Sequence, residues 1–249
     1  MLKLECLSKN NDKRLYEIDI LRGIAIVMMA VFHFMWSLNY LGVVQADLLH
    51  GFWEVFQTMT GSLFILLVGI GLSLSYSRTM RKDPGKYPLK YLYRGLTVFG
   101  YGMIITLVSW LWMPQAYVFF GILHFMGTAI ILATPFIDFV WLNLFIGIIA
   151  LLAGLWAQNI STTIPWLALL GFSYPVNTLD FYTILPWISL VFFGMFLGNM
   201  LYKGAKRAFM LRVKDNTLGS LQFLGRHSLM MYFVHLPIVY TIAFLISLL

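Results

Sequence analysis

The sequence predicts an all-α integral membrane protein: a bundle of about seven transmembrane helices, with an eighth left open, and a cytoplasmic N-terminus. Three observations predict this class. Hydrophobic residues make up 60% of the 249 residues and charged residues only 11%, whereas soluble domains are about half apolar and a quarter charged. Apolar runs near the length of a spanning helix recur along the chain. The Lys and Arg residues lie at the start of the chain, between the second and third runs, and between the sixth and seventh runs. These positions share one side of the membrane, as the positive-inside rule requires.

Seven apolar runs are each close to the roughly 20 residues that a helix needs to cross a bilayer. The first run is too long for the apolar core of a cleaved signal peptide, so we expect it to be retained. A further apolar stretch, 164–174, is about half as long as a span and is interrupted by Pro165 and followed by Pro175. We interpret it as a re-entrant or interfacial segment, and an eighth span over residues 160–175 stays open. The seven predicted spans are 18–41, 52–75, 92–113, 117–135, 139–156, 184–202 and 229–249.

The basic residues give the orientation. With seven spans and the N-terminus inside, all 17 Lys and Arg residues lie on the cytoplasmic side, and the C-terminus is outside. The loops on the opposite side, 42–51, 114–116 and 158–183, contain no Lys or Arg. The basic residues form three groups: Lys3, Lys9, Lys13, Arg14 and Arg22; then Arg78, Arg81, Lys82, Lys86, Lys90 and Arg94; then Lys203, Lys206, Arg207, Arg212, Lys214 and Arg226.

Composition also excludes several classes of function. The net charge of +7 accompanies a mean hydropathy of +0.82, so we relate it to membrane orientation and expect no nucleic-acid partner. The single cysteine, Cys6, cannot form an internal disulfide or a thiolate metal cage. No HxxxH or HExxH spacing occurs, and we expect no metal. Without an internal repeat or a soluble region large enough to fold alone, residues 1–249 are interpreted as one polytopic membrane domain.

Ionisable side chains inside spans are costly and mark candidate functional sites. Arg22 and His33 are eleven residues apart in the first span. At about 100° per residue they lie about 20° apart on one helical face, separated along the axis by roughly 16 Å. Asp19 and Met29 share that stripe. The topology puts Arg22 at the inner surface and His33 in the outer half of the membrane, although Arg22 taken alone is equally well explained as an interfacial anchor.

A second polar group begins the second span. Trp53 and Glu54 follow His50 by three and four residues, so we expect the three side chains to meet on one helical face. His124 lies in the fourth span, about 10 Å below the outer surface.

The last span carries Tyr232 and His235, the latter near the middle of the membrane. Any single histidine is more often a satisfied core group than a catalyst. The four histidines of the spans nevertheless lie toward the outer half of the membrane, near Asp180 and Glu54, and this favours a shared site.

Several of these residues together resemble known membrane acyltransferases. Arg22 followed by His33 is similar to the R-x10-H signature of the acyltransferase-3 family. The chain as a whole more closely resembles the heparan-alpha-glucosaminide N-acetyltransferase catalytic-domain family, in particular its small prokaryotic members. The matching residues, in chain order, are Asp19-Ile20-Leu21-Arg22-Gly23-Ile24-Ala25, His50 with Trp53, Gly121-Ile122-Leu123, Asp180, Leu185-Pro186-Trp187, and Ser228 with Tyr232 and His235.

The resemblance implies a transmembrane acyltransferase. It would move an acyl group, in the first instance acetyl, from cytosolic acyl-CoA to a sugar hydroxyl or amine on the extracytoplasmic side of the cell membrane. Its partners would be acetyl-CoA, a glycan-type acceptor, the lipid bilayer and, from the relatives, a second copy in a homodimer. A heparan substrate is not implied, because the large lumenal region of the heparan enzymes is not in this sequence.

The resemblance also suggests roles for the candidate residues, although the two families disagree on the base. The heparan enzymes keep a histidine at His50 but have Asn at His33 and Gln at His124, whereas the acyltransferase-3 signature implies His33. We keep both as catalytic candidates, with His50 slightly ahead, and direct transfer and an acyl-histidine relay both stay open. The predicted site comprises His50, His33 and Asp180 as catalytic residues, Arg22, Arg94 and Arg226 for acyl-CoA phosphates, and Trp53, Glu54, His124, Tyr232 and His235 as acceptor or supporting residues.

Two other classes fit part of the pattern. A multi-pass transporter of a small polar or glycan-related solute would obey the same charge partition, but transporters commonly show repeated halves or paired broken helices, which this chain lacks. A purely structural membrane partner would leave the membrane histidines without a role. Charge partition alone also explains the basic loops without any bound phosphate.

Overall fold

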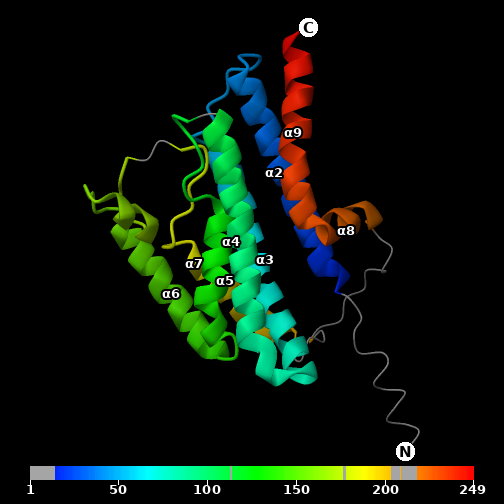
Figure 1. Cartoon of the computed structure of the whole chain (residues 1–249), viewed down its shortest axis with the longest axis vertical. Coiled ribbons are helices and arrows are strands. Elements are labelled where there is room, and N and C mark those ends of the chain that lie inside the picture. The colour runs from blue at the N-terminus through cyan, green and yellow to red at the C-terminus, as the bar shows by residue number, and fades with distance from the viewer. Residues whose placement is uncertain (1–14, 113, 176–177, 203–207, 209–217) are drawn as a thin grey trace, which may run out of the picture. The chain divides into compact units, whose positions relative to one another are not determined.

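The computed structural model describes residues 15–112, 114–175, 178–202, 208 and 218–249, and within them every regular element is a helix. The α-helices are α2 (Tyr16–Tyr40), α3 (Phe52–Lys82), α4 (Tyr87–Trp112), α5 (Ile122–Ala133), α6 (Val140–Ala157), α7 (Ile188–Leu201), α8 (Gly219–Arg226) and α9 (Ser228–Ser247) (Figure 1). Three short 3-10 helices join them: η1 (Pro84–Lys86), η2 (Thr134–Phe136) and η3 (Pro165–Leu170).

Each of the seven predicted spans contains a helix, so the helical membrane class is confirmed. Five helices, α2, α3, α4, α6 and α9, are long and apolar enough to cross a membrane. The other two, α5 with η2 and α7, are apolar but shorter than a full span. The count of seven spans and the cytoplasmic N-terminus therefore stay predictions. Nine of the basic residues behind that orientation lie outside the described residues: Lys3, Lys9, Lys13, Arg14, Lys203, Lys206, Arg207, Arg212 and Lys214.

The outer faces of these helices are apolar. On α4, Leu111 is 71% exposed, and on α6, Ile149 is 65% exposed. Soluble proteins seldom leave such continuous apolar surface in water. A bilayer is the solvent that suits these faces.

Residues 160–175, where an eighth span was a possibility, form a short closed loop. Thr162 N–H donates to the carbonyl of Ser173 at 2.9 Å, and Ser173 N–H donates to Ile160 at 3.0 Å, so the segment leaves and returns at one place. Between these contacts lies η3, only six residues long. Residues 160–175, all of which are described, therefore form no eighth spanning helix.

Turn chemistry explains where α2 ends. Gly42 follows the helix with φ +74°, a left-handed conformation that glycine adopts without steric cost. Gly42 N–H donates to Asn39 and Val43 N–H donates to Leu38, the paired bonds of a Schellman motif. The chain is thereby turned out of the helix just after Tyr40.

The chain divides into two compact units. In the first, Met1–Phe64 with Leu211–Leu249, α2 packs along α8 and α9 (Figure 1). In the second, Ile65–Met210, α4 packs on α5 and α6 packs on α7. The interpretation of residues 1–249 as one functional domain stays a prediction.

Glycines allow the close helix contacts of the second unit. A Cβ on Gly69 of α3 would overlap the backbone of Val191 and Gly194 on α7, and a Cβ on Gly194 would overlap the backbone of Leu66. Likewise, a Cβ on Gly95 of α4 would collide with α5. Such small-residue contacts let helix backbones approach each other where lipid offers no hydrophobic driving force between helices.

Candidate functional site

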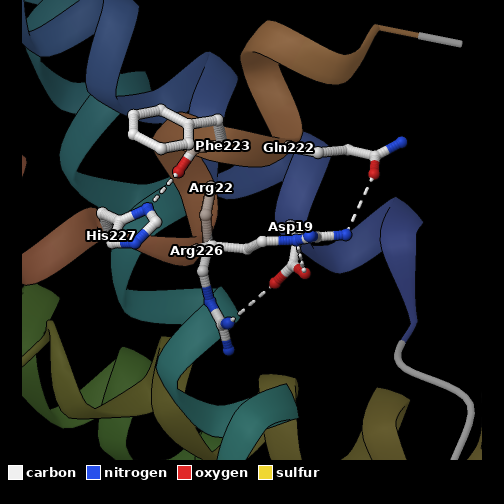
Figure 2. A network of polar contacts seen from close by, with 6 residues as sticks. All are labelled: Asp19, Arg22, Gln222, Phe223, Arg226 and His227. Atoms are coloured by element: carbon white, nitrogen blue, oxygen red, sulfur yellow. Dashed lines mark hydrogen bonds and ion pairs between the residues drawn. The ribbon is translucent and has the colours of Figure 1, made fainter. Parts of the chain in front are cut away.

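A cluster of charged side chains joins the first turns of α2 to the end of α8 in the first unit (Figure 2). The carboxylate of Asp19 uses one oxygen for each of two arginines: Oδ1 lies 3.5 Å from Arg22 Nη1, and Oδ2 lies 3.6 Å from Arg226 Nε. Arg226 Nη2 also donates to Gln222 Oε1 at 3.3 Å. The Asp19 side chain is 3% exposed, whereas those of Arg22 and Arg226 are 28% and 44% exposed. The cluster is therefore anchored on a buried acid and open on its basic side.

Two glycines explain why α8 comes so close to α2. A Cβ on Gly23 would overlap the carbonyl of Leu221, and a Cβ on Gly225 would overlap the carbonyl of Asp19. Only hydrogen atoms fit at these two positions, so the helix backbones touch. This contact carries Arg226, the residue after Gly225, to the Asp19 carboxylate.

Farther along α2, His33 meets His235 of α9. His33 Nδ1 lies 3.1 Å from His235 Nε2, and the ring centroids are 5.0 Å apart. Each Nδ1 also faces a carbonyl of its own helix, that of Met29 at 3.0 Å for His33 and that of Met231 at 3.1 Å for His235. Sequence analysis predicted both histidines as site residues, and the structure brings them together.

The hydrogen bonds assign the tautomers of this pair. A carbonyl oxygen only accepts, so each Nδ1 carries a proton that it donates to its carbonyl. The unprotonated Nε2 of neutral His235 then shares the same His33 Nδ1–H, in a three-centre hydrogen bond with the Met29 carbonyl. His33 keeps its own Nε2 as a lone-pair nitrogen, which is the form that a general base or a nucleophile needs.

Arg22 and His33 face the same neighbouring segment, as their spacing on α2 predicts. Arg22 shares Asp19 with Arg226 of α8, and His33 contacts His235 of α9. Tyr232 lies against His235, with ring centroids 5.8 Å apart. One helix, α2, therefore carries a cationic cluster and a histidine pair separated by roughly 16 Å along its axis.

His50 lies before α3 rather than on it. The helix begins at Phe52, after Gly51 turns the chain at φ +68°. The expectation that His50, Trp53 and Glu54 share one helical face is therefore wrong. Trp53 instead packs beside Phe32 of α2, with ring centroids 6.4 Å apart, and Glu54 is exposed.

His50 is paired with an acid that was not among the predicted site residues. Its Nδ1 lies 3.0 Å from Asp47 Oδ2, and both side chains are largely exposed. Asp47 Oδ1 also accepts the backbone N–H groups of Leu49 and His50. The hydrogen bond from Leu49 N–H, followed by the interaction with His50, lowers the pKa of Asp47 below its usual value. A carboxylate on Nδ1 orients an imidazole, and the D-x-x-H spacing is the sequence signal for this pair.

His124 and Asp180 meet at the start of α5, in the second unit. Gly121 N–H donates to His124 Nδ1 at 3.2 Å, so the neutral ring carries its proton on Nε2. That Nε2 lies 3.3 Å from Thr106 Oγ1, whose own hydroxyl donates to Val118. Both ring nitrogens of His124 are thus occupied, and its side chain is 2% exposed.

Asp180 accepts the first free N–H of the same helix. Its Oδ2 lies 2.9 Å from Ile122 N, and a carboxylate is favourable at the positive end of a helix. The bond from Tyr182 N–H to Phe120 holds the Asp180 loop against the segment before α5. Burial raises the pKa of Asp180 to about 6, against the opposing effect of the Ile122 hydrogen bond. Burial, with the nearby Asp180 charge, also raises the pKa of Tyr182.

The predicted residues thus fall into several separate places rather than one site. The first unit holds the arginine cluster of Arg22 and Arg226, the His33–His235 pair with Tyr232, and the exposed His50. The second unit holds His124 with Asp180, and Arg94, which is exposed on α4. Among the described residues, no three His, Cys, Asp or Glu side chains come together as a metal site. Sequence analysis missed Asp19 as a member of the cluster, although its place on the Arg22 stripe was the available signal.

Comparison with models of protein families gives a match over most of the chain. Residues 14–237 match the family model described as heparan-alpha-glucosaminide N-acetyltransferase, catalytic. No curated protein and no solved structure matches the chain. The matched range covers most of the chain and all of the predicted site residues.

Proposed function

The chain belongs to the heparan-alpha-glucosaminide N-acetyltransferase catalytic family, a family of transmembrane acetyltransferases, and on that premise we propose its donor, acceptor and direction of transfer. The donor is cytosolic acetyl-CoA. The acceptor is a sugar hydroxyl or amine of an envelope glycan on the extracytoplasmic side of the cell membrane. The observation that carries this proposal is that α2 bears both the arginine cluster and the histidine pair, on the side packed against α8 and α9.

The arginine cluster suits the phosphates of the donor. Arg22 and Arg226 present planar guanidinium groups, which pair with phosphate oxygens through two parallel hydrogen bonds. Both side chains are partly exposed. In the predicted topology they lie at the cytoplasmic surface, where acetyl-CoA is available. The pantetheine arm would then extend along α2 and bring the thioester toward His33.

Two histidines are candidates for the reacting group. His33 is supported by its bond to His235, which leaves Nε2 as the basic nitrogen. His50 is supported by the likeness to the heparan enzymes and by the Asp47 carboxylate on its Nδ1. The two assignments make different predictions for single substitutions.

The chemical step needs one base and one leaving group. The acceptor oxygen or nitrogen attacks the thioester carbonyl as the histidine takes its proton. The tetrahedral intermediate then expels the CoA thiolate, which receives that proton from the imidazolium. General base catalysis of this kind contributes about 10²–10⁴-fold. In the relay variant, the lone-pair nitrogen attacks the thioester first and expels the CoA thiolate, which takes up the Nδ1 proton of the acetyl-imidazolium. The acceptor then attacks the acetyl-imidazole, and its proton returns to the imidazole as the acetyl group leaves.

Sealed membrane vesicles test the direction of transfer. Radiolabelled acetyl-CoA is supplied to inside-out vesicles that contain the protein and an envelope glycan extract in their lumen. We expect label to accumulate on lumenal glycan, and to be lost when Arg22 is replaced by Ala. Label that appears only on glycan added outside would contradict the proposed sidedness, and solute flux without any donor would favour a transporter.

A further inference from the structure

Asp19 is the buried centre of the arginine cluster (Figure 2). We propose that Asp19, together with Gln222, is a positioning residue that holds the guanidinium groups of Arg22 and Arg226 as a single site for the diphosphate of the donor nucleotide. This inference rests on the proposed function and extends it, because it names which part of the donor binds and which residues prepare the site.

The geometry of the carboxylate fixes the spacing of the two arginines. One oxygen faces Arg22 Nη1 at 3.5 Å and the other faces Arg226 Nε at 3.6 Å. The two oxygens of a carboxylate are close together, so the guanidinium groups are held on neighbouring sides of one small group. Gln222, which is 6% exposed, holds Arg226 from α8 through its Oε1. Two guanidinium groups held beside each other can each pair with one phosphate of a diphosphate.

The basic groups of the cluster are its accessible part. Arg22 and Arg226 are partly exposed, whereas the Asp19 carboxylate is buried. An arginine has five N–H donors, so it can bond a carboxylate and a phosphate together. A diphosphate would therefore receive charge-assisted hydrogen bonds from both arginines.

A role in holding the helices together is a weaker explanation of the cluster. The backbone contacts at Gly23 and Gly225 already bring α8 against α2. Buried ion pairs contribute little to stability on average, because removing charges from water is costly. Ordering two long side chains before the ligand arrives does, however, strengthen binding, because that entropy is not lost on association.

Calorimetry with three ligands tests the inference without an acceptor. Purified protein in detergent is titrated with CoA, with dephospho-CoA, which keeps the diphosphate but lacks the 3′-phosphate, and with pantetheine, which lacks both. We expect the wild type to bind CoA and dephospho-CoA similarly and pantetheine far more weakly. Asp19→Asn should weaken binding of both nucleotides about tenfold, as expected when two arginines must be ordered on binding, and leave pantetheine unchanged.

Two further variants make the test specific. Gln222→Leu loosens Arg226 without removing the buried charge. It should weaken binding of CoA and dephospho-CoA by less than Asp19→Asn does and leave pantetheine binding unchanged. This variant keeps the test available if Asp19→Asn fails to fold. Asp138→Asn is the matched control, because it removes an exposed carboxylate between η2 and α6. It should bind all three ligands as the wild type does.

The outcomes separate this inference from the proposed function. Unchanged nucleotide binding in folded Asp19→Asn and Gln222→Leu would overturn the inference, and so would an equal loss for all three ligands. A lipid headgroup offers the same phosphate chemistry, so the titration is repeated with phosphatidylglycerol. Displacement of CoA by that lipid at equimolar amounts would assign the site to lipid and also overturn the inference. A folded wild type that binds no CoA would instead refute the proposed function.

Discussion

Two histidine environments in this protein differ in what their ring nitrogens contact. In the second unit, the nitrogens of His124 meet Gly121 N–H and Thr106, and the residue caps α5. In the first unit, His33 and His235 contact each other and leave a lone-pair nitrogen on His33. The same residue type therefore caps a helix in one place and forms a histidine pair, our candidate for the reacting group, in the other. Its partners, rather than its burial, separate the two roles.

Substitution of the paired histidine should have the largest effect. His33→Ala is expected to lower acetyl transfer by about 10²–10⁴-fold, the usual loss when a general base is removed. The readout is transfer of label from radiolabelled acetyl-CoA to an envelope glycan extract, with thermal unfolding as the check on folding.

The companion variants assign the base. His50→Ala should abolish transfer if the Asp47-paired histidine is the base, and His33→Ala should then be active. His227→Ala is the matched control, because the ring of this exposed histidine contacts the carbonyl and the ring of Phe223, four residues earlier in the chain. Normal turnover in both His33→Ala and His50→Ala would contradict base catalysis by either residue.

The glycine contact between α2 and α8 gives the next largest effect. Gly225→Ala should destabilise the protein by about 3 kcal/mol, because its Cβ would overlap a backbone carbonyl that cannot simply rotate away. It should also weaken CoA binding, since Arg226 would move. Gly100→Ala on α4 is the control: outside its own helix backbone, no atom of the described residues lies within 4 Å of the added Cβ, and alanine favours helix over glycine. Thermal unfolding in detergent compares the two, and equal stabilities would mean that the close contact is absent.

The cap at α5 should matter for stability and much less for the donor. His124→Ala leaves Gly121 N–H without its acceptor, so we expect a loss of about 2 kcal/mol. CoA affinity should stay within about twofold of wild type, because the hydrogen-bond partners of His124, Gly121 and Thr106, are not among the residues proposed to bind the donor. A large loss of CoA affinity with unchanged stability would contradict this, because it would place His124 at the donor site rather than in the cap of α5.

The smallest expected effect is a pH dependence from Asp180. Its folded-state pKa is raised to about 6 from a usual value of 3.8, so the folded protein binds more protons than the unfolded chain between these values. Stability should therefore fall as pH rises, by about 1 kcal/mol between pH 5 and pH 7. Asp180→Asn keeps an acceptor for Ile122 N–H and should remove this slope. A wild-type stability that rises over the same interval would show that the Asp180 pKa is not raised.

Much of the fold is predictable from the sequence because apolar length sets membrane helices. All seven predicted segments contain helices, and the face shared by Arg22 and His33 follows from helical periodicity alone. The start of α3 was less predictable, because Gly51 and the Asp47 hydrogen bonds turn the chain just before it. That local turn places His50 outside the helix.

The contacts between distant segments could not be predicted in the same way. The His33–His235 bond and the Asp19–Arg226 ion pair each join residues about two hundred positions apart. Spacing within one helix cannot show which other helix lies opposite. The buried Asp19 is found only when the close approach at Gly23 and Gly225 is known.

The most direct test of the central claim is calorimetric binding of acetyl-CoA to the wild type, Arg22→Ala and His33→Ala. The claim is that α2 binds the donor at one end and reacts at the other. It predicts saturable binding to the wild type, clearly weaker binding to Arg22→Ala, and nearly wild-type binding to His33→Ala together with a loss of transfer. No binding by demonstrably folded wild type, or equal affinity in Arg22→Ala, would contradict it.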